Sequence, residues 1–268
     1  MTPSKGLAQH FLVDRSVMES ILAAADLTSH DTVVEIGPGL GFLTEALAQR
    51  VARLVAVELD PSLARALRSL LAPWPGAVVL EGDARTVDLA PWLPQDAPYK
   101  VVANLPYYAA MPIIRRFLEG ERRPALMVVM LQREVARQMA ASPGKMSLLS
   151  VGVQVYARPR QVRVVPPRSF YPAPQVASAV VRLDVFLQPL IAQEHLEGFF
   201  ALARLAFRAP RKQLGGHLRR TLGLAPERIA QAFAKAGIPI AARPEALSIS
   251  QWESLYHALQ EEGWTPSG

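Results

Sequence analysis

The stretch Val33-Val34-Glu35-Ile36-Gly37-Pro38-Gly39-Leu40-Gly41 decides how the rest of this chain is interpreted. Its first four residues are mostly β-branched, which predicts a short buried strand. Three alternating glycines follow, and residues 42–48 have the pattern of an amphipathic helix. A strand, a glycine turn and a helix in this order form the first unit of a nucleotide-binding α/β sheet, with a ligand against the turn. An ordinary glycine turn without a ligand is the alternative.

The spacing of the glycines separates two kinds of ligand. A dinucleotide site has the pattern G-x-G-x-x-G, whose third glycine would stand where this chain has Phe42. The observed order of Gly37, Gly39 and Gly41 after Glu35 disfavours a pyrophosphate. It resembles motif I of the class I S-adenosylmethionine (SAM) methyltransferases, in which the glycines let the backbone approach the methionine part and the ribose of SAM.

Composition limits the class of protein. Half of the 268 residues are hydrophobic, which suits one large domain or a medium domain with a smaller one. No apolar run reaches about 18 residues, and the first residues lack a secretory hydrophobic segment, so a cytoplasmic protein outside membranes is expected. The chain has no cysteine, which excludes disulfides and thiolate chemistry. Nothing indicates an obligate oligomer, so we expect a monomer.

Positive charge is concentrated in the second part of the chain. Residues 1–100 carry 8 basic and 12 acidic side chains, whereas residues 101–268 carry 21 basic and 11 acidic ones. Residues 135–183 contain seven basic side chains and no acid, and residues 204–220 contain six and no acid. A charge run is usually a solvated face, but two acid-free stretches in a basic protein favour a polyanionic partner.

The residues before the glycine turn predict a helix and a lead-in. Asp14 is placed to cap a helix over residues 15–25. Residues 9–12 combine two polar with two apolar side chains, and they form either a plain loop or a lip over the ligand.

Two acids follow the next predicted strands, at the edge where α/β sheets bind ligands. Glu58 ends the strand at residues 54–58, about 20 residues past the glycines, where a carboxylate can bridge the hydroxyls of a ribose. Asp60 fits a helix N-terminus better. After the strand at residues 78–81, Asp83 can accept a hydrogen bond from the adenine amine of SAM, and the Ala84 N–H can donate to a ring nitrogen.

The fourth predicted strand, residues 99–103, runs into the tetrapeptide Asn104-Leu105-Pro106-Tyr107. An exocyclic amine is a poor nucleophile because its lone pair is delocalised into the ring. Asn104 Oδ1 and the Leu105 carbonyl can accept hydrogen bonds from such an amine and direct its lone pair at the methyl group, so that alignment supplies much of the acceleration. Pro106 stiffens the turn, and Tyr107 can stack on the base. An Asx turn that opens a helix is the alternative.

The remaining segments complete the sheet and add a helical tail. The sequence predicts helices near residues 112–119 and 134–141 and strands at 125–130, 148–156 and 176–183. Phe170 lies in the proline-rich loop before the last strand, where it either forms the second wall of a pocket for a flipped base or packs on the core. Gln188-Pro189 predicts a linker, and apolar side chains recur at helical spacing beyond it.

Together these segments resemble the rRNA adenine N6,N6-dimethyltransferases, most closely the KsgA type that acts on small-subunit (16S) rRNA. The resemblance covers nearly the whole chain, and it is specific because its motifs occur together. Its parts are Gln9-x-Phe11-Leu12, residues 35–41, Glu58, Gly82-Asp83-Ala84, residues 104–107, Phe170-Tyr171-Pro172-x-Pro174 and Arg211-Lys212.

The resemblance implies an α/β fold with two domains. Residues 1–187 would form a class I SAM-dependent methyltransferase domain, a Rossmann-like seven-stranded sheet with an antiparallel last strand. Residues 188–268 would form a small C-terminal helical domain that binds RNA or the ribosome. The implied reaction is four methyl transfers from SAM to N6 of two adjacent adenosines in the 3′-terminal helix loop of 16S rRNA, in a pre-30S particle. SAM is the methyl donor and no metal is expected.

Three sets of residues carry this hypothesis. The expected catalytic residues are Asn104, Leu105, Pro106, Tyr107 and Phe170. The expected cofactor-binding residues are His10, Leu12, Gly37, Gly39, Gly41, Glu58, Asp83, Ala84 and Asn104. The expected RNA-binding residues are Arg208, Arg211, Lys212, Arg219 and Arg220. The chain departs from the family at His10, where Asn is usual, and at residues 108–112, which read Tyr-Ala-Ala-Met-Pro in place of Asn-Ile-Ser-Thr-Pro.

Three alternatives stay open. Large-subunit rRNA adenine dimethylases share the motifs, but we expect them to differ in the tail and in the loop at residues 170–174. DNA adenine N6-methyltransferases more often have Asp in place of Asn104. A mainly non-catalytic ribosome-assembly or transcription factor would keep the fold only to bind RNA, although intact Glu58, Asp83 and Asn104 argue against lost catalysis.

Overall fold

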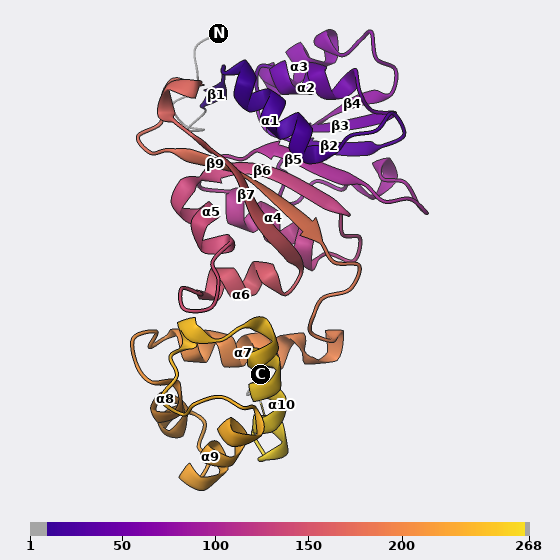
Figure 1. Cartoon of the computed structure of the whole chain (residues 1–268). Coiled ribbons are helices and arrows are strands. Elements are labelled where there is room, and N and C mark those ends of the chain that lie inside the picture. The colour runs from indigo at the N-terminus through magenta and orange to yellow at the C-terminus, as the bar shows by residue number, and fades with distance from the viewer. Residues whose placement is uncertain (1–9, 266–268) are drawn as a thin grey trace. The chain divides into compact units, whose positions relative to one another are not determined.

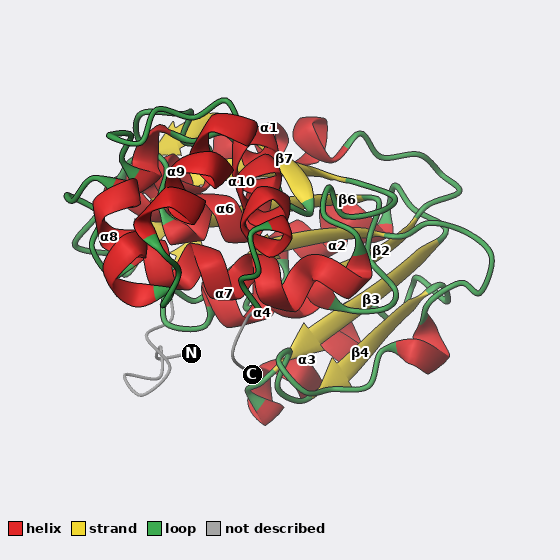
Figure 2. Ribbon diagram, turned by 90° about the horizontal axis from the view of Figure 1, so that it is seen from below, coloured by secondary structure: helices red, strands yellow, loops and turns green. Residues whose placement is uncertain are grey.

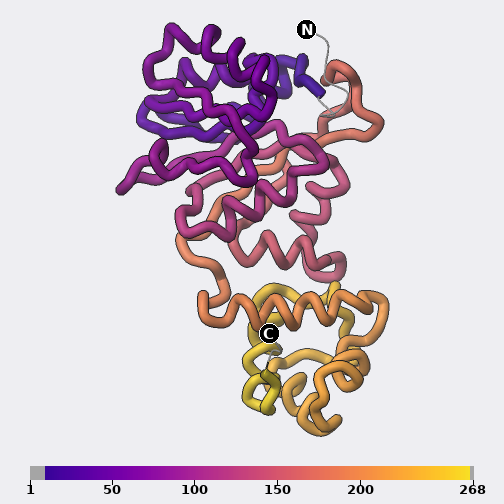
Figure 3. Tube along the Cα trace, turned by 180° about the vertical axis from the view of Figure 1, so that it is seen from behind, coloured from indigo at the N-terminus to yellow at the C-terminus, as the bar shows by residue number. Residues whose placement is uncertain are grey.

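The chain folds into two compact units, which a computed structural model describes over residues 10–265. The first unit comprises the residues up to 137 together with 158–187, and the second comprises 138–157 together with the residues from 188 onward. The trace in Figure 3 shows that the polypeptide enters the second unit twice. Residues 138–157, which the sequence placed in the first domain, therefore belong to the helical unit.

A seven-stranded sheet forms the first unit, in the order β4-β3-β2-β5-β6-β9-β7 (Figure 1). Its strands are β2 (Thr32–Ile36), β3 (Arg53–Glu58), β4 (Ala77–Glu81), β5 (Lys100–Asn104), β6 (Leu126–Gln132), β7 (Ala157–Val165) and β9 (Ser178–Val185). The five strands from β2 to β6 pair in parallel, whereas β9 runs antiparallel to β6. The predicted class I methyltransferase fold, with its antiparallel last strand, is confirmed.

Helices cover both faces of this sheet, with α1, α2 and α3 on one face and α4 and α5 on the other (Figure 1). Their bounds are α1 (Arg15–Ala25), α2 (Phe42–Ala48), α3 (Pro61–Leu70), α4 (Ala110–Glu119) and α5 (Arg133–Met139). Helix α3 packs on β3 and β4 (Figure 2). All five residues of β2 are buried, as expected for a central strand that is covered on both faces.

Two aspartates begin helices as their positions in the sequence indicate. Asp14 accepts a hydrogen bond from the Ser16 N–H at 3.0 Å, and Asp60 accepts one from the Ser62 N–H at 2.8 Å. Such caps satisfy backbone donors that have no partner inside the helix. Asp60 is therefore the cap of α3.

The first acid-free stretch includes two arginines that hold the fold together. Arg163 of β7 donates to the Ser16 carbonyl at 2.7 Å, and Arg182 of β9 donates to the Ala24 carbonyl at 2.8 Å. Both acceptors are backbone groups of α1. These two guanidinium groups fasten that helix to the sheet, so part of this positive charge has a structural role.

One predicted strand is wrong, because residues 148–156 contain helix α6 (Leu148–Gln154). A short apolar run fits a buried strand and a buried helix equally well. Here Ser147 and Ser150 form a capping box that begins the helix. The strand of this region is instead β7, which begins directly after the predicted one, at residues to which the sequence analysis assigned no strand.

The second unit is helical. Besides α6 it contains α7 (Leu196–Phe207), α8 (Leu214–Thr221), α9 (Pro226–Lys235) and α10 (Ile249–Glu261), together with short 3₁₀ helices at Gln193–His195 and Pro244–Ala246. Two further 3₁₀ helices, Ala90–Trp92 and Pro167–Ser169, lie in the first unit. Phe199 and Trp252 are buried at its centre. The Gly144 N–H donates to the Glu245 carbonyl at 2.7 Å, and the Leu190 N–H donates to the Val155 carbonyl at 2.8 Å, so backbone bonds tie residues 138–157 to the tail. Across residues 10–265, no helix is both long and apolar enough to cross a membrane.

Candidate active site

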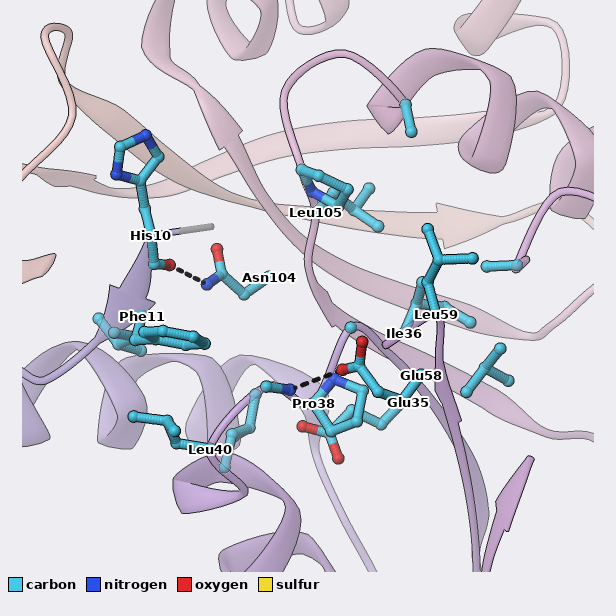
Figure 4. Close-up of a pocket in the computed structure, with 18 of the residues that line it drawn as sticks. His10, Phe11, Glu35, Ile36, Pro38, Leu40, Glu58, Leu59, Asn104 and Leu105 are labelled. Carbon is cyan, nitrogen blue, oxygen red and sulfur yellow. Dashed lines mark hydrogen bonds between the residues drawn. The ribbon is translucent and has the colours of Figure 1, made fainter. Parts of the chain in front are cut away.

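A cavity of about 390 Å³ lies at the carboxyl ends of the parallel strands (Figure 4). This volume is in the usual range for a small-molecule site. The cavity is lined by all five predicted catalytic residues and by every predicted cofactor-binding residue except Gly41. Parallel strands bring these segments together because their carboxyl ends meet at one edge of the sheet.

The three glycines of the turn have different roles. All three have positive φ, at 66° for Gly37, 59° for Gly39 and 86° for Gly41, where a side chain is strained. A Cβ on Gly39 would also lie 3.0 Å from Phe11 Cδ1, and one on Gly41 would lie 2.4 Å from Leu70 Cδ2. Gly41 therefore lets α2 begin close to α3 and does not line the cavity.

Glu58 ties the end of β3 to the glycine turn. One carboxylate oxygen accepts the Gly39 N–H at 3.1 Å, and the other accepts the Asp60 N–H at 2.9 Å (Figure 4). Burial raises the pKa of this carboxyl, while the two N–H groups act in the opposite direction. Each oxygen keeps a further lone pair with which to accept a hydroxyl group.

Glu35 is a second buried carboxyl at the same end of the cavity. Its side chain is 1% exposed, and Oε2 has no hydrogen-bond partner. Burial raises the pKa of Glu35 to about 8, and the nearby Glu58 acts in the same direction. Within the described part of the chain, no basic side chain forms an ion pair with either glutamate. A cationic ligand suits this end of the cavity, and an anionic one does not.

Asp83 meets a basic partner at the other end. The Arg85 side chain donates to both carboxylate oxygens, at 3.0 Å from Nε to Oδ1 and 2.6 Å from Nη2 to Oδ2. This guanidinium holds the pKa of Asp83 below its usual range. Asp83 is thus an ionised acceptor that is fixed in place.

The Asn104 side chain is held in one orientation. Its Nδ2 donates to the His10 carbonyl at 3.2 Å (Figure 4), which leaves Oδ1 as an acceptor without a partner among residues 10–265. The Leu105 N–H donates to the Met130 carbonyl at 3.0 Å, which fixes the backbone of the turn. Asn104 Oδ1 is therefore the atom that can accept a hydrogen bond from a ligand.

The lead-in forms a lip beside the cavity. Strand β1 (Phe11–Leu12) pairs antiparallel with β8 (Phe170–Tyr171). His10 Nδ1 lies 2.7 Å from the Pro172 carbonyl, so its ring is tied to the proline-rich loop. Phe170 is buried and lines the cavity, whereas Tyr171 is 67% exposed. Phe170 packs on the core and also lines the cavity, and its role as a wall for a flipped base stays a prediction.

Two residues around the site carried no signal in the sequence. Arg116 of α4 donates to the carbonyls of Ala84 and Val87 and so fixes the loop that contains Asp83. Ser178 of β9 forms a hydrogen bond with the Tyr107 hydroxyl at 2.7 Å. A helical arginine and a serine in an apolar strand are too common to be noticed before their partners are known.

The expected RNA-binding residues lie in the second unit. Arg208, Arg211, Lys212, Arg219 and Arg220 are all exposed. None of them forms an ion pair with another described residue. The described residues contain no group of three or more His, Cys, Asp or Glu that could hold a metal ion.

The sheet order and the cavity at its carboxyl edge define a class I SAM-dependent methyltransferase. A family model described as ribosomal RNA adenine dimethylase matches residues 3–261. The chain belongs to the ribosomal RNA adenine dimethylase family, and its methyl donor is SAM.

Curated relatives and solved structures agree with this family. Ribosomal RNA small subunit methyltransferase A of Dehalococcoides mccartyi is 43% identical over 251 residues, which cover 94% of this chain and 86% of the relative. The protein of the same name from Alkaliphilus metalliredigens is 38% identical, over 94% of this chain and 90% of the relative. The crystal structure of the 23S rRNA methyltransferase ErmE has a TM-score of 0.77 and 30% identity, over 93% of this chain and 99% of that one. A dimethyladenosine transferase from Plasmodium falciparum shares the fold, with a TM-score of 0.82, 22% identity and coverage of 95% and 99%.

We expect Glu35→Gln to stabilise the protein increasingly as the pH rises from about 5 to 8. Between its ordinary pKa of 4.5 and about 8, Glu35 is protonated in the folded protein and ionised in the unfolded one. The unfolded state then binds fewer protons, so stability is lost with rising pH, by at most about 1.4 kcal/mol per pH unit. Glutamine removes this dependence. Thermal unfolding of both proteins across this range measures it.

The matched control is Glu19→Gln, which removes an exposed carboxyl of α1. It shows what the loss of a carboxyl by itself does to thermal unfolding. If the difference in stability between Glu35→Gln and the parent protein is constant from pH 5 to 8, Glu35 is not neutral in the folded protein.

Proposed function

We propose that this protein transfers methyl groups from SAM to N6 of two adjacent adenosines in the 3′-terminal helix loop of small-subunit (16S) rRNA, and dimethylates both. Relatives that cover most of the chain are named ribosomal RNA small subunit methyltransferase A. The observation that carries the proposal is the clamped Asn104, whose single unpartnered acceptor borders the cavity. The proposed setting is a pre-30S particle in the cytoplasm, with the protein acting as a monomer.

The residues of the cavity suit SAM, which supplies an electrophilic methyl group on a positively charged sulfur. Glu35 and Glu58 are buried carboxyls without a basic partner among the described residues, so a cationic ligand would offset the cost of burying them. Gly37 and Gly39 leave room for the methionine part. Glu58 would accept the ribose hydroxyls, and Asp83 with the Ala84 N–H would bind the adenine. His10 and Leu12 would close the cavity from the lead-in, while Gly41 would act through packing.

Asn104 and Leu105 would prepare the amine of the target adenosine for attack. Both would accept its N–H groups, which localises the nitrogen lone pair and aligns it with the methyl group. The bond from Asn104 Nδ2 to the His10 carbonyl supports this role, because it prevents the amide from presenting a donor to the amine. The amine proton can leave after the transfer, so no basic side chain is required during attack.

Tyr107 and Phe170 would form the walls of the pocket for the flipped base. Tyr107 is part-buried and its hydroxyl is hydrogen-bonded to Ser178, so the ring is held in position at its far end. Stacking on an aromatic ring offsets the stacking free energy that a flipped base loses when it leaves its neighbours in RNA. Pro106 would limit the movement of the turn between Asn104 and Tyr107.

The exposed cations of the second unit would bind the rRNA backbone. The five basic side chains expected to bind RNA have no acidic partner in the described chain. Phosphate groups attract such side chains without regard to base sequence. They would provide affinity, while the cavity selects the adenosine.

The function is tested with labelled SAM and small ribosomal subunits that lack the modification, followed by mass spectrometry of the rRNA. We expect dimethyladenosine at two neighbouring positions near the 3′ end. Labelled methyl groups in large-subunit rRNA or in DNA would support the proposed reaction but overturn the proposed substrate. Binding of SAM and subunits without any transfer would favour an assembly factor instead.

We expect Asn104→Ala to lower kcat by about 10²- to 10³-fold, the usual effect of losing a group that acts mainly in the transition state. The dissociation constant of SAM should rise less than about tenfold, because glycine, Glu58 and Asp83 contacts stay. Single-turnover methylation and calorimetric SAM binding separate the two effects. Asn104→Asp keeps an acceptor oxygen and should retain more activity. Equal turnover in Asn104→Ala and the parent would contradict the mechanism.

We expect Arg211→Gln/Lys212→Gln to weaken RNA binding and to flatten its salt dependence. Loss of two phosphate contacts lowers the slope of log K against log salt by about 1.4 to 1.8. Fluorescence titration of the 3′-terminal rRNA helix at several salt concentrations measures the slope. Arg50→Gln/Arg65→Gln in the first unit removes the same charge as a control and should leave the slope nearly unchanged. Equal slopes for both double variants would exclude Arg211 and Lys212 from the interface.

A further inference from the structure

The hydrogen bond between Tyr107 and Ser178 joins the target-base wall to the sheet. The Tyr107 hydroxyl lies 2.7 Å from Ser178 Oγ, with either atom able to donate. Ser178 is the first residue of β9, and its side chain is fully buried. Its hydroxyl has no other hydrogen-bond partner in the part of the chain described.

The position of Ser178 in the sheet makes it a rigid anchor. Ser178 pairs with Gln132 at the carboxyl end of β6. Two residues earlier on that strand, the Met130 carbonyl accepts the Leu105 N–H at 3.0 Å. The same strand therefore holds the backbone of the turn directly and the far end of the Tyr107 side chain through Ser178.

A tyrosine ring turns about two single bonds, and this ring is held at both ends. Its Cα belongs to the turn that Met130 fixes, and its hydroxyl is bound to a buried strand residue. On one side, the His10 ring lies at a centroid distance of 6.0 Å and an angle of 31°. Turning the side chain about its Cα–Cβ bond would carry the Tyr107 hydroxyl away from Ser178 and break the only hydrogen bond of the buried Ser178 hydroxyl, which costs free energy.

We propose that Ser178 is a positioning residue for methyl transfer, which fixes the position of the Tyr107 ring on which the target adenine stacks. This inference rests on the proposed function. Misplacing a stacked base by a fraction of its diameter misaligns the amine with the methyl group, and such errors lower kcat strongly. Ser178 does not line the cavity, so its removal should leave the cofactor contacts intact.

A double-mutant cycle of Ser178→Ala and Tyr107→Phe tests the proposal. Each change removes one hydroxyl of the same bond, so each should lower kcat about tenfold with unmodified subunits as substrate. The double variant should lose about the same tenfold rather than a hundredfold, because the bond can be lost only once. The dissociation constant of SAM should change less than twofold in all three variants.

Ser169→Ala is the matched control. Ser169 is also a buried serine near the cavity, 1% exposed, but its hydroxyl donates to Asp14 Oδ2 at 2.8 Å. The reductions in kcat from Ser169→Ala and Tyr107→Phe should multiply in the double variant, since the two hydroxyls do not take part in the same hydrogen bond. Ser178→Thr restores a hydroxyl and should recover part of the lost kcat.

The outcomes separate this inference from the proposed function. An inactive parent protein that binds SAM would overturn the proposed function. If the parent is active but the reductions in kcat from Ser178→Ala and Tyr107→Phe multiply in the double variant, as expected for the Ser169→Ala control, only the positioning role is overturned. A loss that appears as weaker SAM binding with unchanged kcat would overturn it as well. If Ser178→Ala alone is unstable, Tyr107→Phe still tests the inference, because unaltered SAM affinity together with an unchanged kcat in that variant would overturn the positioning role.

Discussion

The parallel pairing of the strands from β2 to β6 is the constraint on which the site depends. Parallel strands all end at the same edge, so whatever follows each strand meets there. The register pairs Ile36 with Val57, Glu58 with Glu81 and Asn104 with Met130. These partners, which are 21, 23 and 26 positions apart in the sequence, are thereby neighbours. A shift of one strand would move its functional residue away from the cavity.

Electrostatics then divides the cavity into two ends. At one end, Glu35 and Glu58 are buried with no basic side chain to pair with in the described structure, and burial raises the pKa of both. At the other end, the pKa of Asp83 is lowered by Arg85. Buried carboxyls without a partner cost stability in the free protein. A cationic ligand offsets that cost, which links the composition of this site to the charge of what it binds.

A second layer of contacts fixes the reacting groups from outside the cavity. The His10 carbonyl holds the Asn104 amide, and Arg116 holds the loop that carries Asp83. The pairing of β1 with β8 places Phe170 against the same space. These contacts leave few rotatable bonds free around Asn104, and the proposed transfer, which depends on alignment, would gain from such order.

The sequence by itself determined the elements whose signals are local. The glycine turn, Glu58 after the second strand, the Asn104 tetrapeptide and the caps Asp14 and Asp60 were all identified in this way. Each depends on neighbours within a few residues, and the backbone conformation needed there restricts which residues fit. The wrong strand at residues 148–156 shows the limit, because its apolar pattern suits a helix equally well.

Only the tertiary structure decided the partners of these residues. It assigned Arg163 and Arg182 to the support of α1, residues 138–157 to the helical unit, and Gly41 to packing against Leu70. It also joined Asn104 to His10, 94 positions away, and Tyr107 to Ser178, 71 positions away. Such contacts are not encoded in any local pattern, since they depend on where the sheet brings distant backbone together and on which buried polar atoms then need a partner.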